Sequence, residues 1–474
     1  MNSTKVILST ALLTTSAFSG MKAGVKAEST DKKNVLFIIV DDLRPELNSY
    51  GVSGMITPNL DKLAQNGVQM NQAYCNIPVS GASRASLMTG LRPGKSRWWD
   101  VNAEIDKEAP EAITLPKHFK ENGYTTISNS KVIHGKNDAK DSWSKIWKPK
   151  GRGSWRNYLG DENLEGEKSK GNAYAYECLD VHDSDYFDGA TADKTIKDLR
   201  QLKDNKQPFF LAVGILKPHL PFNAPKKYWD LYKESDIQLP ANYNMDRSSY
   251  PKQAFHTWNE IRFYKNLPQK GPLEDTAEAK RLIHGYKACV SYADAQIGRI
   301  MDELKNLGLD KNTVVVLIGD HGWSLGDHGE WCKHSNFSVV NRSVCFVSAP
   351  DLNKGKKVDE VIEFVDLYPT ICDLAGVEKP AHLEGESFKT LISKGDSQWK
   401  NTAVVKWHNG ISLMTPEYRY TEWFTMDNGK SQASMLFKIS DDPQENRNLA
   451  KDKKYDKIKE KLKKEMEAKM GVDL

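Results

Sequence analysis

Residues 34–40 read Asn-Val-Leu-Phe-Ile-Ile-Val and are followed directly by Asp41 and Asp42. The run from Val35 to Val40 contains no polar residue, so both faces of the segment are apolar. A strand that faces water on one side alternates apolar and polar residues, whereas a strand covered on both faces is apolar throughout. The run therefore predicts a central strand of a sheet that lies between two layers of helices.

Three further strand-like segments, each followed by polar residues, occupy residues 124–128, 209–213 and 313–318. Between the strands lie segments with apolar residues at helical spacing, the longest running from Leu282 to Leu304. Helices that alternate with buried strands indicate an α/β fold, with a large, mainly parallel sheet sandwiched by helices. The polar residues after the strands are then expected at one edge of the sheet, where ligands of such folds bind.

Three carboxylates belong to this expected edge. Asp41 and Asp42 follow the first strand, and Asp320 follows the strand at 313–318, with His321 next to it. Three carboxylates in one place repel one another unless a cation neutralises them, and oxygen ligands favour Ca²⁺, with Mg²⁺ as the alternative. Imidazole suits softer metals, so His321 is the least typical member of this set. We expect a site for one divalent metal ion here.

The segment after residue 74 combines a serine with a short helix. Residues 80–82 read as a loop of small residues, Ser83 as a helix cap, and Gly90 as the end of the helix. Ser80 would then lie at the positive end of the helix, with Arg84 one turn later, which favours a bound anion. The alternative interpretation is an ordinary capped helix on the surface.

The segment also resembles the signature of the type I sulfatases, which belong to the alkaline phosphatase superfamily. In that signature a Cys or Ser is followed closely by Pro or Ala, Ser and Arg, before a Thr-Gly pair. This chain has Ser80-Gly81-Ala82-Ser83-Arg84 and Thr89-Gly90. The resemblance implies that a serine-type maturase oxidises Ser80 to formylglycine (3-oxoalanine), the true nucleophile. It also implies a metal site formed by Asp41, Asp42, Ser80, Asp320 and His321.

Residues 320–337 and 216–222, together with the segment from Lys131 to His134, resemble the iduronate 2-sulfatase branch of that family. This resemblance implies a catalytic set of Ser80, Arg84, Lys131, His134, His219 and Lys333. It further implies that the sulfated substrate is bound by Arg84, Lys131, His219, Lys333 and His334. The expected substrate is a carbohydrate sulfate ester, most specifically a 2-O-sulfated uronic acid of a glycosaminoglycan oligosaccharide.

Composition and the two ends of the chain set its organisation. Residues 1–27 have the order of charged, apolar and small residues found in a cleaved secretory signal, which implies export to the periplasm or the exterior of a bacterial cell. Residues 28–397 are predicted to form the catalytic α/β domain. Residues 398–474 hold short strand-like segments and a charged helix, and predict a smaller antiparallel-sheet subdomain.

No segment after residue 27 is apolar enough to predict a membrane span, and acidic and basic residues are mixed, with a formal charge of +4. Such a mixture does not predict binding to nucleic acid. The six cysteines have no Cys-x-x-Cys spacing, and their pairing is left open.

The sequence leaves two functions open besides that of a sulfatase. The first is a metal-dependent phosphatase or phosphodiesterase of the same superfamily, which needs a second metal ion. The candidate ligands for that ion are His321 and His382. The second is a protein that binds sulfated glycans without catalysis, if Ser80 stays unmodified.

Overall fold

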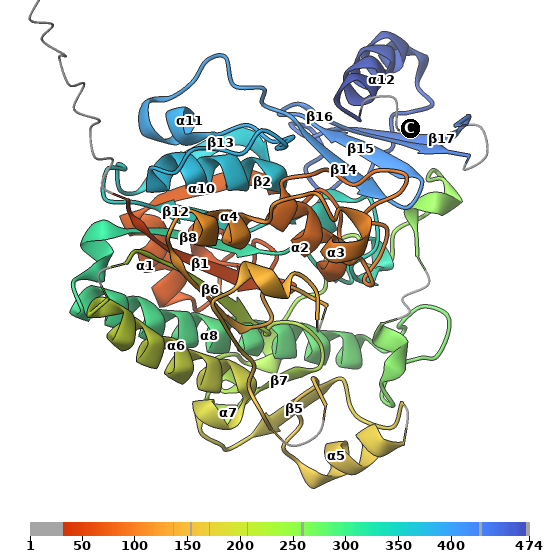
Figure 1. Ribbon diagram of the computed structural model, residues 1–474. Helices are drawn as coiled ribbons and strands as arrows, with labels where there is room; N and C mark the ends of the chain where they lie inside the picture. Colours follow the sequence, from red (N-terminus) through yellow and green to blue (C-terminus); the bar gives the residue numbers. More distant parts are fainter. Residues whose placement is uncertain are drawn as a thin grey trace, which may run out of the picture. The chain divides into compact units, whose positions relative to one another are not determined.

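The computed structural model describes residues 32–135, 137–151, 154–169, 171–205, 207–256, 260–425 and 429–470 (Figure 1). The predicted export signal, residues 1–27, lies outside the described residues. From Lys32 onward the chain forms one compact unit. A boundary at residue 397 between two domains therefore stays a prediction.

The centre of the fold is the strand predicted from residues 34–40. Strand β1 (Asn34–Val40) pairs in parallel with β6 (Phe209–Ile215) on one side and with β8 (Thr313–Gly319) on the other. Val40 pairs with Ile215 and with Gly319, so these three strands end at the same level. Strand β3 (Thr125–Ser130) continues the parallel order beside β6. The residues after all four strands therefore meet at one edge, as the sequence predicts.

Both faces of this sheet are covered. Along β1, Leu36, Ile38 and Val40 belong to one hydrophobic core, whereas Val35, Phe37 and Ile39 belong to a second core on the opposite face. The first core includes helices α1 (Pro58–Asn66), α6 (Phe187–Lys203) and α8 (Thr276–Asn306). The second includes α2 (Ser80–Thr89), α4 (Leu115–Glu121) and α10 (Leu367–Ala375). Figure 1 shows the strands running between these two sets of helices. The predicted sandwich is confirmed.

The full sheet has the order β11-β2-β12-β8-β1-β6-β3-β4, with β13 paired to β2. It is parallel from β8 to β4, whereas β12 runs antiparallel to its neighbours β2 and β8. Residues 136–176 show no apolar period, which predicts surface loops, and this prediction is wrong in part. The segment contains the short elements β4 (Lys145–Trp147) and α5 (Asp161–Lys168) and the first residue of β5 (Tyr176–Leu179). The α-helices and strands before residue 397 that complete the described fold are β2 (Val68–Tyr74), β4 (Lys145–Trp147), β5 (Tyr176–Leu179), β7 (Phe222–Pro225), β9 (Ser324–Leu325), β10 (Trp331–Cys332), β11 (Arg342–Ser343), β12 (Cys345–Ser348), β13 (Lys356–Glu363), α3 (Ile105–Glu108), α5 (Asp161–Lys168), α7 (Lys226–Trp229), α9 (Ser338–Asn341) and α11 (Lys389–Lys394).

The C-terminal strands form a separate antiparallel sheet, as predicted. Its strands follow one another in the order β14 (Ala403–Trp407), β15 (Gly410–Met414), β16 (Tyr418–Phe424) and β17 (Ser431–Lys438). Helix α12 (Asp456–Met470) packs Leu462 and Met466 against one face of it. The sheet joins the segment that precedes α2, because the backbone N–H of Lys406 donates to the Asn76 carbonyl at 2.8 Å. The C-terminal sheet therefore supports the segment that carries Ser80.

The cysteines and the Trp98–Trp99 pair lie within the described part of the chain. All six cysteines lie within the described residues and carry free thiols. The adjacent Trp98 and Trp99 predict core packing rather than stacking on a sugar ring. Trp98 is fully buried, as predicted, whereas Trp99 is partly exposed. None of the helices in the described part of the chain combines the length and the apolar character that crossing a bilayer requires.

A buried ion-pair network links the C-terminal region to the end of α2. The Glu363 carboxylate accepts from Arg92 Nη2 at 2.5 Å, from Lys400 Nζ at 2.6 Å and from Asn76 Nδ2 at 2.7 Å. Burial raises the pKa of Glu363, but the charges of Lys400 and Arg92 outweigh it and hold the pKa well below its ordinary value. The carboxylate is therefore ionised and holds two cations and the Asn76 side chain together.

Replacing Glu363 by Ala should lower the free energy of unfolding by about 3–5 kcal/mol, because Arg92 and Lys400 would lose a buried counter-charge. Equilibrium urea unfolding measures the loss. The control is Glu460→Ala, which removes the exposed i,i+4 pair with Lys464 and should cost under about 0.5 kcal/mol. Equal losses in the two variants would contradict a stabilising role for the buried network.

Candidate active site

The ends of β1, β3, β6 and β8 bring together most of the residues selected from the sequence. Asp41 and Asp42 follow β1, and Asp320 and His321 follow β8. All four side chains are fully buried. Lys131 follows β3, and His219 lies in the turn after β6. The predicted convergence of polar side chains at one sheet edge is confirmed.

Helix α2 begins at Ser80 itself, with Val79 as the residue before it, so the predicted loop at 80–82 and the cap at Ser83 are wrong. The Ser83 hydroxyl instead donates to the Asp320 carbonyl at 2.5 Å. Gly81 is required where it stands, because a Cβ there would overlap the backbone of Val101. The end of the helix at Gly90 is as predicted. Every residue of α2 is buried, which excludes the alternative of an ordinary surface helix.

Arg84 connects this helix to two strands. Its Nη2 lies 2.9 Å from Asp41 Oδ1, and its Nε lies 3.0 Å from Asp320 Oδ2. It also donates to the backbone carbonyls of Lys131 and Val132. Burial lowers the pKa of Arg84, but the Asp320 and Asp41 carboxylates raise it above its usual value, so the guanidinium stays charged. One fixed cation thus holds two carboxylates in place, Asp41 beside Ser80 and Asp320 beside His321.

The Ser80 hydroxyl lies between two of the predicted metal ligands. Its Oγ is 3.1 Å from Asp41 Oδ1 and 3.1 Å from His321 Nε2. His321 Nδ1 lies 2.8 Å from the Gly322 carbonyl. A carbonyl oxygen only accepts, so Nδ1 carries the hydrogen and the neutral ring presents the lone pair of Nε2. That lone pair faces Asp42 Oδ1 at 3.3 Å and Asp320 Oδ1 at 3.6 Å.

This arrangement fits a divalent cation. Donor atoms of Asp42, Asp320 and His321 all lie within 4.8 Å of one another. Burial raises the pKa of Asp42 well above its ordinary value, and Asp41, Glu260 and Asp320 add to the rise, although Lys333 opposes it. A cation among these groups would relieve both the repulsion between carboxylates and the repulsion of the His321 lone pair.

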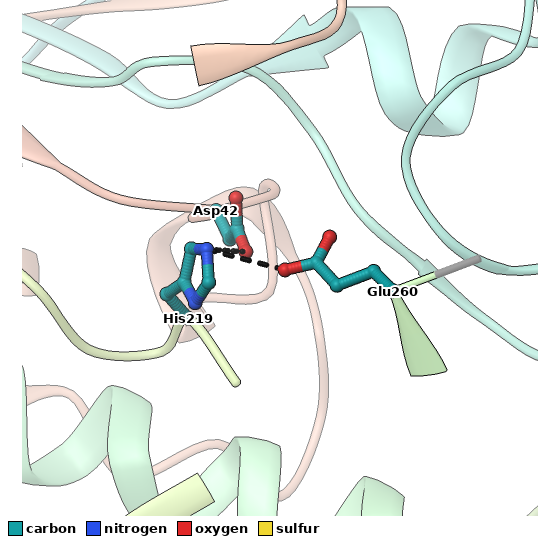
Figure 2. Close-up of side chains that lie close together, drawn as sticks. All are labelled: Asp42, His219 and Glu260. Atoms are coloured by element: carbon teal, nitrogen blue, oxygen red, sulfur yellow. Dashed lines mark ion pairs between the residues drawn. The ribbon is translucent and has the colours of Figure 1, made fainter. Parts of the chain in front are cut away.

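Glu260 joins the cluster although sequence reasoning did not select it. Figure 2 shows its carboxylate beside His219 and Asp42. Glu260 Oε1 lies 3.2 Å from His219 Nε2, and Asp42 Oδ2 lies 3.8 Å from the same nitrogen. Glu260 follows no strand of the sheet and belongs to no motif, so no sequence signal indicated it. By contrast, His382, a candidate ligand for a second metal ion, faces the Thr89 carbonyl at 3.0 Å, at the far end of α2.

Two lysines balance part of the negative charge. Lys131 Nζ lies 2.5 Å from Asp41 Oδ2, and Lys333 Nζ lies 2.9 Å from Asp42 Oδ1 and 3.2 Å from Glu260 Oε2. Burial raises the pKa of Asp41, but Lys131 and the other nearby cations hold it well below its ordinary value. Asp41 is therefore ionised, and it lies in direct contact with Ser80, Arg84 and Lys131.

The histidines differ in how closely they join this cluster. His219 Nδ1 lies 2.6 Å from the Leu220 carbonyl, which leaves Nε2 facing the carboxylates, and burial together with Lys333 lowers its pKa to about 3. Burial and Lys131 lower the pKa of His134 to about 4, and its buried Nδ1 has no hydrogen-bond partner among the described residues. His334 stands apart: its ring lies 5.1 Å from that of Trp407, and within the described chain it forms no hydrogen bond with the cluster.

Comparison with known proteins identifies the family. The family model described as Sulfatase matches residues 33–377, and the model described as N-sulphoglucosamine sulphohydrolase, C-terminal matches residues 326–471. The chain is 29% identical to iduronate 2-sulfatase of Mus musculus in an alignment that covers 94% of this chain and 96% of the relative. It is 32% identical to a sulfatase of Formosa agariphila over 84% of this chain and 80% of the relative. It is 26% identical to delta 4,5-hexuronate-2-O-sulfatase of Bacteroides thetaiotaomicron over 92% and 88%.

Solved structures share the fold at lower identity. A phosphonate monoester hydrolase from Silicibacter pomeroyi superposes with a TM-score of 0.77 at 20% identity, over 94% of this chain and 96% of that one. A 2-O GAG sulfatase superposes with a TM-score of 0.71 at 22% identity, over 92% and 91%. The similarity in sequence, the matching family model and the cluster around Ser80 agree. The chain therefore belongs to the sulfatase family and is a sulfuric ester hydrolase.

Proposed function

We propose that this enzyme removes sulfate from 2-O-sulfated uronic acids at the ends of glycosaminoglycan oligosaccharides. The observation that carries the reaction type is the position of Ser80 Oγ, 3.1 Å from both Asp41 and His321 at the first turn of a buried helix. The proposed identity of the sugar is supported by two relatives, the mouse iduronate 2-sulfatase and the bacterial hexuronate-2-O-sulfatase, which match 94% and 92% of the chain. Residues 1–27 would export the enzyme to the periplasm or the exterior of a bacterial cell.

In this proposal a serine-type maturase oxidises Ser80 to formylglycine, whose hydrated aldehyde supplies the nucleophile for sulfur. The residues around it attract and hold the sulfate group. The N-terminal end of α2 carries a partial positive charge, and Arg84 adds a full one. Lys131 and Lys333 now contact carboxylates. When substrate binds, each would keep some of these contacts and also donate charge-assisted hydrogen bonds to sulfate oxygens.

The metal proposal rests on the crowding of buried carboxylates. Asp41, Asp42, Asp320 and His321, with residue 80, would hold one divalent cation, and we propose Ca²⁺ because oxygen donors dominate. When bound, the cation neutralises these ligands and draws charge from the sulfate oxygens. Mg²⁺ is the alternative, although it prefers a stricter octahedral arrangement.

Two histidines are proposed to move protons. His219 has its Nδ1 hydrogen directed at the Leu220 carbonyl, so its Nε2 would give a proton to the leaving sugar oxygen, with Lys333 Nζ beside it. Burial and Lys333 give His219 a pKa of about 3, which is too low for this role, but the negative charge of a sulfate ester would raise it. His134 is neutral at pH 7, given its pKa of about 4, and would accept a proton from the hydrate at residue 80.

A metal-dependent phosphodiesterase or phosphatase is the competing function, since many such enzymes use a second metal ion about 4 Å from the first. Asp42, His219 and Glu260 could supply donor atoms for it. However, Lys333 Nζ lies 2.9 Å from Asp42 and 3.2 Å from Glu260, so an ammonium group already neutralises these two carboxylates. A second dication would have to displace Lys333, which favours the sulfatase. The remaining alternative, a non-catalytic glycan-binding protein, requires an unmodified Ser80.

We expect the peptide that contains residue 80 to lack two hydrogens relative to serine in protein purified from its own host. Intact-peptide mass spectrometry measures this difference, and the same material should begin after residue 27. A control preparation from a host without a serine-oxidising system should retain serine and be inactive. Active native enzyme that contains only serine at residue 80 would rule out the formylglycine mechanism.

One calcium ion per chain should be found by elemental analysis of the purified protein. Asp320→Asn keeps the shape of the side chain but removes a charged ligand, so it should lose the ion, the increase in melting temperature caused by added Ca²⁺, and more than about 99% of the activity. Asp359→Ala, at an exposed position on β13, should retain all three properties. Two zinc ions per chain would instead favour the phosphodiesterase.

With enzyme verified to carry formylglycine, sulfate should be released from a 2-O-sulfated uronic acid at the non-reducing end of a disaccharide. The comparison substrate is a 6-O-sulfated glucosamine disaccharide, and the Ser80→Ala variant serves as the blank. Ion chromatography of free sulfate measures both reactions. Release from the 6-O-sulfated sugar alone would overturn the 2-O-uronate proposal while leaving the assignment as a sulfatase intact.

A further inference from the structure

Glu260 lies beside the side-chain nitrogens of His219 and Lys333. Its Oε1 lies 3.2 Å from His219 Nε2 and 3.5 Å from Lys333 Nζ, and its Oε2 lies 3.2 Å from Lys333 Nζ. His219 Nε2 is the group proposed to protonate the leaving sugar oxygen, and Lys333 Nζ lies beside it. Any sugar oxygen that approaches both nitrogens must therefore come next to the Glu260 carboxylate, whose side chain is only 17% exposed.

An ionised carboxylate accepts hydrogen bonds and donates none. The substrate group that complements it is therefore a hydroxyl, and a sugar hydroxyl on the carbon next to the ester lies beside the ester oxygen. A substrate carboxylate at the same place would be repelled by Glu260 and by Asp42. The uronate carboxylate must then point away from Glu260, which restricts how the sugar ring can lie in the site.

Trp155 lies on another side of His219. Its ring centroid is 5.3 Å from that of His219 at an interplanar angle of 89°, and the residue is 51% exposed. Its neighbours are held in place: Ser154 N donates to Glu167 Oε2 at 3.0 Å, and Asn223 Nδ2 donates to the Arg156 carbonyl at 3.0 Å. A single exposed apolar side chain is common. An exposed indole that packs edge-on against the proposed proton donor is suited to contact the apolar face of a sugar ring.

We propose that Glu260 and Trp155 form the recognition site for the leaving sugar, with Glu260 accepting a hydrogen bond from the hydroxyl next to the ester-bearing carbon and Trp155 packing against the ring. The proposal rests on the proposed function and adds the groups that select the sugar. It predicts that a neighbouring free hydroxyl is part of what the enzyme recognises. The sulfate-binding residues Arg84, Lys131 and Lys333 do not supply this selection.

The test combines one variant with two substrates. The substrates are the methyl glycoside of 2-O-sulfated iduronic acid and its 3-deoxy analogue, which lacks the neighbouring hydroxyl. Glu260→Ala should lower kcat/KM about 10- to 100-fold for the first substrate, because a hydrogen bond to a charged group is lost. It should change kcat/KM less than about 3-fold for the deoxy analogue. Glu260→Gln, which keeps the shape and a weaker acceptor, should show the same selectivity at a smaller magnitude and serves if the alanine variant does not fold.

Trp155→Ala should raise KM about 3- to 10-fold for both glycosides, since the ring contact does not depend on the 3-hydroxyl. Leu231→Ala removes another exposed apolar side chain (42%), outside the site, and should leave both KM values unchanged.

If Glu260 only positioned His219 and Lys333, its removal would lower kcat/KM for both substrates by the same factor, and that result would overturn the proposal. An unchanged KM in Trp155→Ala would also overturn it. If the wild-type enzyme released sulfate from neither glycoside, that result would instead reject the proposed function on which this inference depends.

Discussion

The buried guanidinium of Arg84 is the group on which the rest of the site depends. It lies between Asp41, at the end of β1, and Asp320, at the end of β8, and it belongs to the same helix as Ser80. A buried guanidinium without counter-charges would be very costly, and so would two buried carboxylates without a cation. Each group therefore requires the others, and their mutual pairing fixes the first turn of α2 against the sheet edge.

The balance of charge around Ser80 explains which chemistry the site favours. Asp41 lies beside Ser80, and Asp42 and Asp320 lie beside His321, so the proposed dication would neutralise a crowded group of carboxylates. Lys333 lies between Asp42 and Glu260 and balances charge on the other side of Asp42. Phosphonate monoester hydrolases share this fold, so the sheet alone does not decide the reaction. The lysine between Asp42 and Glu260 is the local feature that favours the proposed single metal ion over a second one.

Much of the fold follows from local patterns in the sequence. The apolar run of β1 predicts a doubly covered strand, and the polar residues after β1, β3, β6 and β8 predict the site, because parallel strands end at one edge. Glu260 could not be found in this way, since only tertiary packing brings it to His219. The small residues at 80–82 predict a loop, because small residues often precede a helix cap. The close approach of Val101 to Gly81 instead makes these small residues part of a buried helix.

Burial of α2 also affects when Ser80 is accessible to another enzyme. Every residue of this helix is covered, and the preceding Asn76 is hydrogen-bonded to Lys406, more than three hundred positions later in the chain. The segment around Ser80 therefore cannot reach its final packing until nearly the whole polypeptide has been made. At translation rates of about 5–20 residues per second, this leaves an interval of roughly 15–65 s during which the segment is still open. Any enzyme that modifies Ser80 must act in that interval or on a chain that is kept unfolded.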